Sequence, residues 1–198
     1  MNEIFLTSDT HFSHNKDFLF GPRKFDNVDD MNEAIIERWN KIVRPDDTVY
    51  HLGDIALNDD KKGIECVNQL NGKIIWLLGN HDSPIRVQNF LDNCSNLKLH
   101  RDRYATYLNL TVLDMKLQFY LSHYPTVTTN FDQKHFSRHI INLHGHTHQS
   151  TNWRDLDNPF MYHVGLDSHN CTPVHIDEAV TDIKQRWREL AQIIKVGE

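Results

Sequence analysis

Five short segments of the chain carry aspartate, asparagine and histidine side chains in patterns that suit metal chemistry. They are Asp9-Thr10-His11, Gly53-Asp54, Gly79-Asn80-His81-Asp82, Ser122-His123 and Gly145-His146-Thr147-His148. Two Asp, one Asn and four His in these segments make a mixed oxygen and nitrogen ligand set, which suits Mn, Fe, Ni, Co or Zn better than Mg or Ca. These seven side chains are more ligands than one tetrahedral ion can bind. They fit two ions about 3.5–4 Å apart that share a carboxylate, the arrangement used for in-line displacement at phosphorus.

Each of these segments follows an apolar run that is typical of a buried strand. The runs are Ile4–Ser8, Thr48–Leu52, Lys73–Leu78, Lys116–Ser122 and Ile140–His144. In α/β sheets, ligands gather beyond the carboxyl ends of the strands. Glycines before several of the polar residues let the backbone turn sharply at that point. We therefore expect residues spread over about 140 positions of the sequence to converge on one cleft.

The remaining elements follow from the spacing of apolar residues and from capping signals. The pattern predicts helices over Asp30–Val43, with Asp29 or Asp30 as N-cap, over Lys61–Asn71, and after Ser83-Pro84. In the second half, Tyr104–Leu113 and Lys116–Ser122 predict a hairpin, Met161–Gly165 a further strand, and the C-terminal apolar stripe an amphipathic helix. The order of βα units, then strands, then a helix indicates two packed sheets with helices outside, in one domain.

Composition and charge narrow the class of protein. The 198 residues suit a single domain, and 39% hydrophobic with 24% charged residues is ordinary for a globular chain. A formal charge of -6 argues against a broad nucleic-acid-binding surface but leaves a small cationic pocket open. Three cysteines without CxxC spacing predict free thiols, and the N-terminus lacks the pattern of a signal peptide. The longest clean apolar run, Ile74–Leu78, is too short to cross a bilayer, so we expect a cytoplasmic protein with no membrane association.

The five segments, in this order, resemble the signature of the calcineurin-like metallophosphoesterase superfamily, which reads DxH, GD, GNH[DE], H and GHxH. The stretches "TSDTHFSH", "DDTVYHLGD", "LNGKIIWLLGNHD" and "VGLDSHNCTPVHIDE" are similar to a small bacterial and phage branch of that superfamily. The likeness extends over nearly the whole chain. It implies an α/β fold of two packed β-sheets flanked by helices, a four-layer sandwich, as a single domain over residues 1–198.

The resemblance also implies a role for each motif residue. One metal ion would be bound by Asp9, His11, Asp54 and His148, and the other by Asp54, Asn80, His123 and His146, with Asp54 bridging. His81 would face the substrate, stabilise the phosphoryl charge and protonate the leaving oxygen, while Asp82 orients it. Of the three alternating histidines in "LHGHTHQS", the first, His144, is still on the strand and is expected to be a core residue or to support a ligand.

A few neighbouring residues have two interpretations. His14 follows the first motif and either contacts substrate, supports a ligand or is structural. Arg23, in a loop before the first long helix, either reaches a phosphate or lies on the solvated surface. A turn-forming role is expected for Asp167. His51, inside a strand, is expected to be structural, and Tyr124 either lines the substrate pocket or lies on the surface.

The function that the sequence favours is a dinuclear phosphodiesterase that uses a metal-bridging hydroxide for in-line attack on phosphorus. Mn is the first choice for both ions, with Fe, Ni, Co or Zn as alternatives. The substrate would be a small phosphate ester, a nucleotide or a nucleic-acid end. Few arginines lie near the motifs, which favours a diester over a monoester, and "GDIALND" lacks the GDxVDRG pattern of the protein phosphatases. The alternatives are a phosphomonoesterase, such as a nucleotidase or phosphatase, with the same centre, and a non-catalytic scaffold of the same fold. The oligomeric state is left open.

Overall fold

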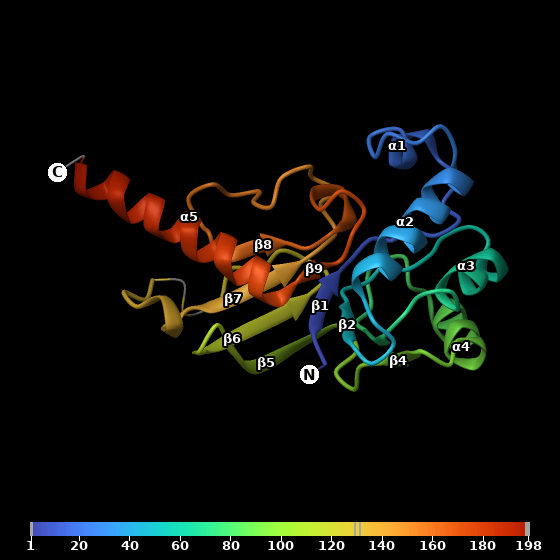
Figure 1. Ribbon diagram of the computed structural model, residues 1–198, viewed down its shortest axis with the longest axis horizontal. Helices are drawn as coiled ribbons and strands as arrows, with labels where there is room; N and C mark the ends of the chain where they lie inside the picture. The colour runs from blue at the N-terminus through green and yellow to red at the C-terminus, as the bar shows by residue number, and fades with distance from the viewer. Residues whose placement is uncertain (1, 129, 131, 197–198) are drawn as a thin grey trace.

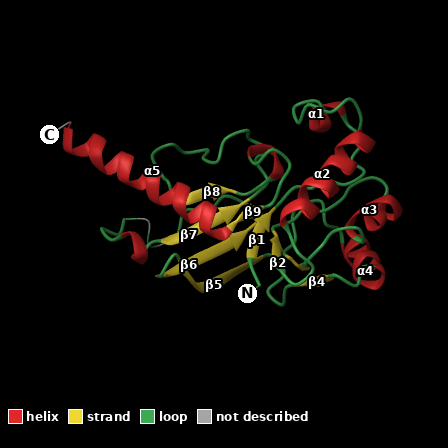
Figure 2. Ribbon diagram, viewed as in Figure 1, coloured by secondary structure: helices red, strands yellow, loops and turns green. Residues whose placement is uncertain are grey.

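Two β-sheets form the centre of the molecule, and helices flank them (Figures 1 and 2). The computed structural model describes residues 2–128, 130 and 132–196; positions 1, 129, 131, 197 and 198 of the single domain expected over 1–198 lie outside the described residues. The first sheet has the strand order β4-β3-β2-β1-β9, and the second has the order β5-β6-β7-β8. This arrangement confirms the α/β class and the pair of helix-flanked sheets.

The strands of the first sheet are mostly parallel. They are β1 (Ile4–Thr7), β2 (Thr48–His51), β3 (Lys73–Trp76), β4 (Leu97–Leu99) and β9 (Val174–His175). The first four run parallel, and β9 is antiparallel to β1. In the second sheet, the predicted hairpin pairs β5 (Ala105–Val112) with β6 (Met115–Ser122). The strands β7 (Ile140–His144) and β8 (Met161–His163) then add parallel to β6.

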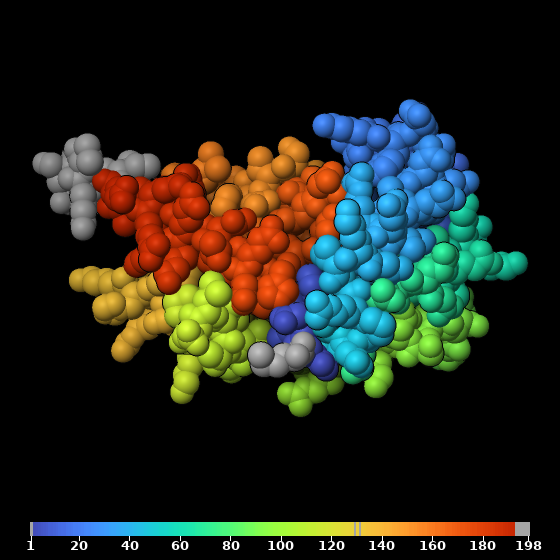
Figure 3. All heavy atoms as spheres, in the orientation of Figure 1, coloured from blue at the N-terminus to red at the C-terminus, as the bar shows by residue number. Residues whose placement is uncertain are grey.

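Five α-helices and two 3₁₀ turns complete the described chain. They are α1 (Asp17–Phe20), α2 (Val28–Ile42), α3 (Asp60–Val67), α4 (Pro84–Asn93), α5 (Ile176–Val196), η1 (Phe136–Arg138) and η2 (Leu166–Ser168). Figure 2 shows α2, α3 and α4 on one side of the strands and α5 on the other. In Figure 3, α5 lies against the β5–β6 hairpin and the segment before β8. Its polar contacts there include those from Lys184 to the Met115 sulfur and from Arg186 to the carbonyl of Leu156.

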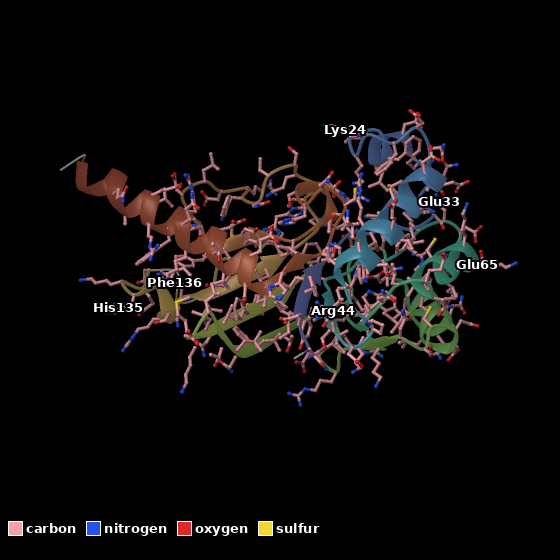
Figure 4. The ribbon with its side chains drawn as sticks, in the orientation of Figure 1. Lys24, Glu33, Arg44, Glu65, His135 and Phe136 are labelled. Atoms are coloured by element: carbon pink, nitrogen blue, oxygen red, sulfur yellow. The ribbon has the colours of Figure 1, made fainter. Side chains whose placement is uncertain are left out.

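Two apolar cores follow from the alternation of side chains along the strands. Phe5, Val49 and Ile74 point towards α2, α3 and α4 and belong to one buried cluster. Leu6 and Leu52 are among the residues that point the other way, into a second cluster with the inner face of the second sheet and with α5. Each fully buried side chain of this kind stabilises the fold by roughly 1.5–3 kcal/mol. Figure 4 shows the polar exterior of the helical side, where Glu33 and Glu65 point away from the sheets, and Phe136 at the opposite end.

Backbone pairing brings the carboxyl ends of both sheets together. The parallel course of β1, β2 and β3 carries their following loops to one edge, and an isolated bridge between Phe12 and Ala56 extends that pairing beyond the strands. A second bridge pairs Ser8 with Gly165, so the loop after β1 lies beside the loop after β8. The loops that carry the five motifs therefore share one edge of the molecule.

The structure corrects some element boundaries. Helix α2 begins at Val28 with Asn27 as N-cap, whose side chain accepts from the backbone N–H of Asp29 and Asp30, so these two aspartates lie in the first turn. Helix α3 ends at Val67 instead of Asn71, because tight-turn hydrogen bonds replace the helical ones. The Ser83 cap before Pro84 is confirmed. Strands β4 and β9 and helix α1 were not predicted, since two to four residues are too few to show periodicity.

The helices and the cysteines bear on two predictions made for the whole chain. Within the described residues, every helix is too short or too polar to cross a membrane. The three cysteines, Cys66, Cys94 and Cys171, are buried free thiols, as their odd number predicts.

Candidate metal centre

The backbone is strained at five of the residues that the sequence predicts as metal ligands. Asp9, His11, Asp54, His146 and His148 have φ values of +58°, +47°, +57°, +69° and +46°. A non-glycine residue in this left-handed region costs roughly 1–3 kcal/mol and persists only where the surrounding structure holds it. Strain of this kind gathers at functional sites, so the backbone marks these loops independently of their side chains.

Three glycines next to the motifs allow unusually close packing. Gly53 has φ +101°, so it does supply the predicted turn. Gly79 and Gly145 act differently from that prediction, because neither has a positive φ in the structure. A Cβ at Gly79 would lie 2.2 Å from Asp54 Oδ1, and a Cβ at Gly145 would lie 2.3 Å from Asp9 Oδ2. The space that these two glycines leave is therefore occupied by the carboxylates of the site.

One group of ligand atoms forms around Asp9 and His11. His11 Nε2 lies 3.9 Å from Asp9 Oδ1 and 3.7 Å from Asp54 Oδ2, and His148 Nε2 lies 3.9 Å from Asp9 Oδ1. Asp9 Oδ1 and both ring nitrogens of His11 are buried without a hydrogen-bond partner among the described residues. Buried polar atoms normally have partners, so these atoms suit a bound cation. The donor set of carboxylate and imidazole fits a divalent metal ion.

A second group of ligand atoms forms around His123. Its Nδ1–H donates to the carbonyl of Leu52 at 2.8 Å, which leaves the Nε2 lone pair free to point into the site. His123 Nε2 lies 2.9 Å from Asn80 Oδ1 and 3.4 Å from Asp54 Oδ2, and His146 Nδ1 also lies 2.9 Å from Asn80 Oδ1. Acceptor atoms this close together need a positive charge between them, either a proton on an imidazole or a metal ion.

Asp54 joins the two groups. Its Oδ2 lies 3.7 Å from His11 Nε2 and 3.4 Å from His123 Nε2, while its Oδ1 accepts the backbone N–H of His81 at 2.8 Å. Asp9 is also close to both, because Asp9 with His11 and His148, and Asp9 with Asp54 and His123, each form a set that is compact enough for one ion. The residues present thus fit a cation on each side of Asp54, and the assignment of individual ligands stays a prediction.

The charges in the site depend on one another. Burial opposes the charged form of His123, but the nearby carboxylates of Asp54 and Asp9 outweigh it and raise the pKa of His123 to about 9. Burial would likewise raise the pKa of Asp54, but its contact with His123 holds that pKa well below the usual range. A metal-bound imidazole must be neutral, so a metal ion would displace the proton of His123 and take over its charge.

His81 and Asp82 have separate surroundings. The His81 side chain is exposed, and its ring centroid lies 5.6 Å from that of His11, so it borders the ligand atoms from the open side. Asp82 is buried, and its oxygens accept the backbone N–H groups of Gly79 at 2.7 Å and Asp54 at 2.8 Å. Burial raises the pKa of Asp82 to about 6, although the hydrogen bonds from those N–H groups lower it. These contacts hold the loops after β2 and β3 together, which differs from the predicted contact with the His81 ring.

Asp167 is a part of the site that sequence reasoning missed. It lies in η2, and its two oxygens accept from Arg23 Nε and Nη2, both at 2.9 Å. The same carboxylate accepts from His148 Nδ1 at 3.0 Å, so His148 Nε2 is directed towards Asp9. Hydrogen bonds from a ligand imidazole N–H to a carboxylate are a common support of metal sites. The side chain of Asp167 therefore binds Arg23 and His148, which the expected turn-forming role did not include.

Arg23 also differs from its prediction. Its side chain is only 1% exposed, which excludes the solvated-surface alternative. Besides binding Asp167, it donates to the carbonyl of Asp9 at 2.7 Å and to that of Thr10 at 3.3 Å. These contacts direct the guanidinium inwards to the protein, and the alternative in which Arg23 reaches a phosphate stays a prediction. The loops of Arg23 and Asp167 lie side by side because the backbone of Ser8 pairs with that of Gly165. The sequence pattern does not predict this pairing.

Two predicted histidines lie close to the ligand atoms without belonging to either group. His14 is buried, and its ring centroid lies 5.2 Å from that of His11 and 6.5 Å from that of His81. His144 is the last residue of β7, fully buried, and its Nδ1 lies 2.9 Å from the carbonyl of Gly145. His144 is thus buried in the core, and its support of a ligand, like a substrate contact for His14, stays a prediction.

Comparisons with known proteins agree with this arrangement. Residues 2–165 match the Calcineurin-like phosphoesterase superfamily domain. The Gene 66 protein of Mycobacterium phage D29 is 31% identical over 201 residues, which cover 93% of this chain and 99% of that protein. The Uncharacterized protein MJ1445 of Methanocaldococcus jannaschii is 46% identical over 84 residues, which cover 41% of this chain and 48% of that protein. This chain thus spans about half the length of the archaeal relative.

A solved structure has a similar fold. The protein of unknown function AQ665 from Aquifex aeolicus superposes with a TM-score of 0.62 at 19% sequence identity, covering 88% of this chain and 96% of that chain. The likeness is one of fold alone.

Proposed function

The chain belongs to the calcineurin-like phosphoesterase superfamily and is a metal-dependent phosphoester hydrolase, and on this premise we propose that it hydrolyses phosphodiesters at a centre of two divalent metal ions. The observation that carries the proposal is the position of Asp54 Oδ2 between His11 and His123, at 3.7 and 3.4 Å from their Nε2 atoms. Mn is the first candidate for both ions, since the donors mix oxygen and nitrogen, and Fe, Ni, Co or Zn are the alternatives.

When bound, such a pair of ions lowers the pKa of a water molecule to give a nucleophile near neutral pH and draws charge from a phosphoryl oxygen. The protein contributes the orientation of the ligands. The carbonyl of Leu52 fixes the tautomer of His123, and Asp167 fixes that of His148, so that both Nε2 lone pairs face the site.

His81 is the proposed acid of the reaction. It is exposed beside His11, and its backbone N–H is anchored by Asp54 Oδ1. Neither candidate metal group includes it. An imidazole at that position is placed to hold the phosphoryl charge and to give a proton to the leaving oxygen, which is worth roughly 10²–10⁴ in rate.

The surroundings of the phosphate favour a diester over a monoester. A monoester dianion gains from additional cationic donors, above all from arginines. Arg23 is directed to Asp167, and Arg86 donates to Asp60 and to the carbonyl of His81. Both of these arginines thus bind protein groups, and a monoanionic diester needs such donors less. The substrate class that we propose is a small phosphate ester, nucleotide or nucleic-acid end in a reducing cytoplasm.

The test compares bis-nitrophenyl phosphate with nitrophenyl phosphate under the same metal and pH. The expected result is a kcat/KM that is roughly tenfold or more higher for the diester. A preference for the monoester would overturn the diesterase assignment in favour of a phosphomonoesterase with the same centre. Bound metal without turnover of either ester, or of a panel of nucleotides, would instead indicate the non-catalytic scaffold.

A further inference from the structure

Two exposed aromatic side chains lie at opposite ends of the candidate metal centre. Phe18, on α1, is 71% exposed, and Tyr124, directly after the ligand His123, is 51% exposed. In Figure 1, α1 stands out from the body of the molecule beside α2. Single exposed apolar residues are common on proteins. What distinguishes these two is that each packs against histidines of the site.

A row of contacts runs from one aromatic ring to the other through the site. The ring centroid of Phe18 lies 5.6 Å from that of His14, and the His14 centroid lies 5.2 Å from that of His11. At the other end, the Tyr124 centroid lies 5.2 Å from that of His123. Asp54 Oδ2 is in the middle, within 3.7 Å of His11 and 3.4 Å of His123. The atoms that would hold the metal ions, and through them the phosphate, therefore have one exposed ring near either end of this row.

We propose that Phe18 and Tyr124 stack on the two nucleoside arms of a short nucleotidyl phosphodiester, which makes this class of diester the substrate. The inference rests on the proposed phosphodiesterase function. A phosphodiester held by metal ions beside Asp54 would extend two ester arms, and the structure offers one aromatic face for each. Bases of every kind stack on aromatic side chains, because each has a π-face.

The surface around the two rings favours a flat, short substrate. An acyl chain needs a contiguous apolar groove, whereas Phe18 and Tyr124 are single rings next to polar histidines and aspartates. A long nucleic acid needs a track of positive charge to bind its phosphates. The formal charge of -6 argues against such a track, so a dinucleotide or the end of a strand fits better than a long duplex.

The position of His81 assigns one arm to each ring. Its ring centroid lies 5.6 Å from that of His11 and 6.5 Å from that of His14, so His81 is on the Phe18 side of the site. His81 is the proposed donor of a proton to the leaving oxygen. The leaving arm is therefore directed towards Phe18, and the arm that stays on phosphorus stacks on Tyr124. In the hydrolysis, a water molecule loses one proton to solvent and its oxygen forms the new bond to phosphorus. The bond from phosphorus to the leaving oxygen breaks, the proton from His81 ends on the leaving alcohol, and His81 then takes up a proton from solvent.

A pair of esters with the same leaving group tests the Tyr124 side. Thymidine 5′-nitrophenyl phosphate and methyl nitrophenyl phosphate both release nitrophenolate and differ only in the retained arm. The expected kcat/KM of the Mn-loaded wild type is about tenfold higher for the thymidine ester, the size of one base–aromatic stack. Tyr124→Ala should bring that ratio close to one, and Tyr124→Phe should keep it. The matched control is Tyr107→Ala, since Tyr107 is 59% exposed in the β5–β6 hairpin and packs on Tyr120 instead of a ligand.

Phe18 should respond differently to the same pair of esters. Phe18→Ala should leave the thymidine-to-methyl ratio unchanged, since both esters lose the same group. It should lower kcat/KM for a dinucleoside phosphate by about tenfold relative to thymidine 5′-methyl phosphate, and Phe18→Trp should restore the preference.

The outcomes separate the inference from the function on which it rests. A wild-type ratio near one, or a ratio that Tyr124→Ala leaves unchanged, would overturn the stacking assignment. Exchanged responses of Phe18 and Tyr124 would overturn the assignment of the arms. Failure of the metal-loaded wild type to hydrolyse either nitrophenyl ester would instead contradict the proposed phosphodiesterase function.

Discussion

Two layers of histidines lie at the same edge of the sheets and behave in opposite ways. The inner layer consists of His51, His144 and His163, each the last residue of its strand and fully buried. The outer layer, which lies in the loops just beyond the strands, consists of His11, His123, His146 and His148. The distance along the chain between the layers is small, since only Gly145 separates His144 from His146. The role of each imidazole depends on whether the chain has already left the strand.

The inner histidines are held neutral. The Thr10 hydroxyl donates to the carbonyl of Ile55 and therefore accepts from His51 Nε2 at 2.9 Å, and His144 Nδ1 donates to the carbonyl of Gly145. Burial lowers the pKa of His51 and of His163 to about 3 and that of His144 to about 4. Each of these rings has one hydrogen-bond partner, and the second nitrogen of each (His51 Nδ1, His144 Nε2 and His163 Nε2) is buried without a partner among the described residues, so an unpartnered nitrogen alone does not mark a ligand.

The outer histidines point their nitrogen lone pairs at carboxylate and amide oxygens. His123 and His11 both approach Asp54, and His148 approaches Asp9. Convergence of lone pairs is favourable only around positive charge, so geometry, more than burial, separates a ligand histidine from a core histidine. The predictions below test this difference, from the largest effect to the smallest.

Removal of the carboxylate between the two groups should have the largest effect. Asp54→Ala should reduce activity to background and weaken metal binding on both sides, because His11 and His123 would lose the same partner. The measurement is metal content after dialysis together with hydrolysis of bis-nitrophenyl phosphate. The control is Asp47→Ala, since Asp47 is also buried but accepts from the N–H groups of Glu3 and Arg44. Two ions bound to Asp54→Ala with wild-type affinity would contradict the shared role.

Replacement of the exposed histidine should affect rate and spare the metal. His81→Gln should lower kcat by roughly 10²–10⁴-fold for esters with poor leaving groups, because the leaving oxygen loses its proton donor. The loss should be smaller for nitrophenyl esters, whose leaving oxygen scarcely needs a proton. Metal analysis of the purified variant is the control. An emptied metal site in His81→Gln would place His81 among the ligands and refute its role as acid.

Loss of the hydrogen bond that supports one outer histidine should moderately lower the affinity for one of the two metal ions. Asp167→Asn should weaken the hold on His148, whereas His123 keeps its contact with Leu52. The expected result is a 10–100-fold weaker affinity for one metal ion and an unchanged affinity for the other, measured by metal titration. Asp182→Asn is the control, since Asp182 accepts from the Tyr162 hydroxyl instead. An equal loss of affinity for both ions would show that Asp167 acts only through the stability of the fold.

Replacement of an inner histidine should change stability and leave the rate within a few-fold of wild type. A histidine whose pKa is lowered in the folded state must take up a proton on unfolding once the pH falls below its unfolded pKa, about 6.5. The stability that the neutral ring contributes is thus present above that pH and is lost as the pH falls towards the folded pKa of about 4 for His144. His144→Gln removes this titration.

The measurement is urea unfolding of the metal-free protein at pH 7 and pH 5. Between pH 7 and pH 5, the wild-type free energy of unfolding should fall by roughly 2 kcal/mol more than that of His144→Gln. Equal slopes would mean that His144 is not held neutral. A loss of metal in His144→Gln would move it to the outer layer.

The sequence allowed much of this arrangement to be predicted, for a physical reason. The predicted ligands follow buried strands, and both the strands and the motifs appear as short local patterns in the sequence. For this reason β2, β7 and the loops after them lie where the apolar runs indicate. Contacts between distant loops leave no such pattern. Arg23 and Asp167 are 144 positions apart and meet only because the loops after β1 and β8 pair.

Two other features could not be predicted from local sequence patterns. The contacts of Asp82 with the backbone of Gly79 and Asp54 depend on how two parallel loops stack. The exposed ring of Phe18 lies on a helix of four residues, too short to show any period. In both cases the tertiary structure, and not the residue type, determines the role.

The most direct test of the central claim is a titration of metal-free protein with Mn, with bound metal and phosphodiester hydrolysis measured on the same samples. The account predicts no hydrolysis without metal, saturation at two ions per chain, and recovery of activity as the second ion binds. Saturation at a single ion, or full activity in excess chelator after confirmed removal of metal, would contradict it.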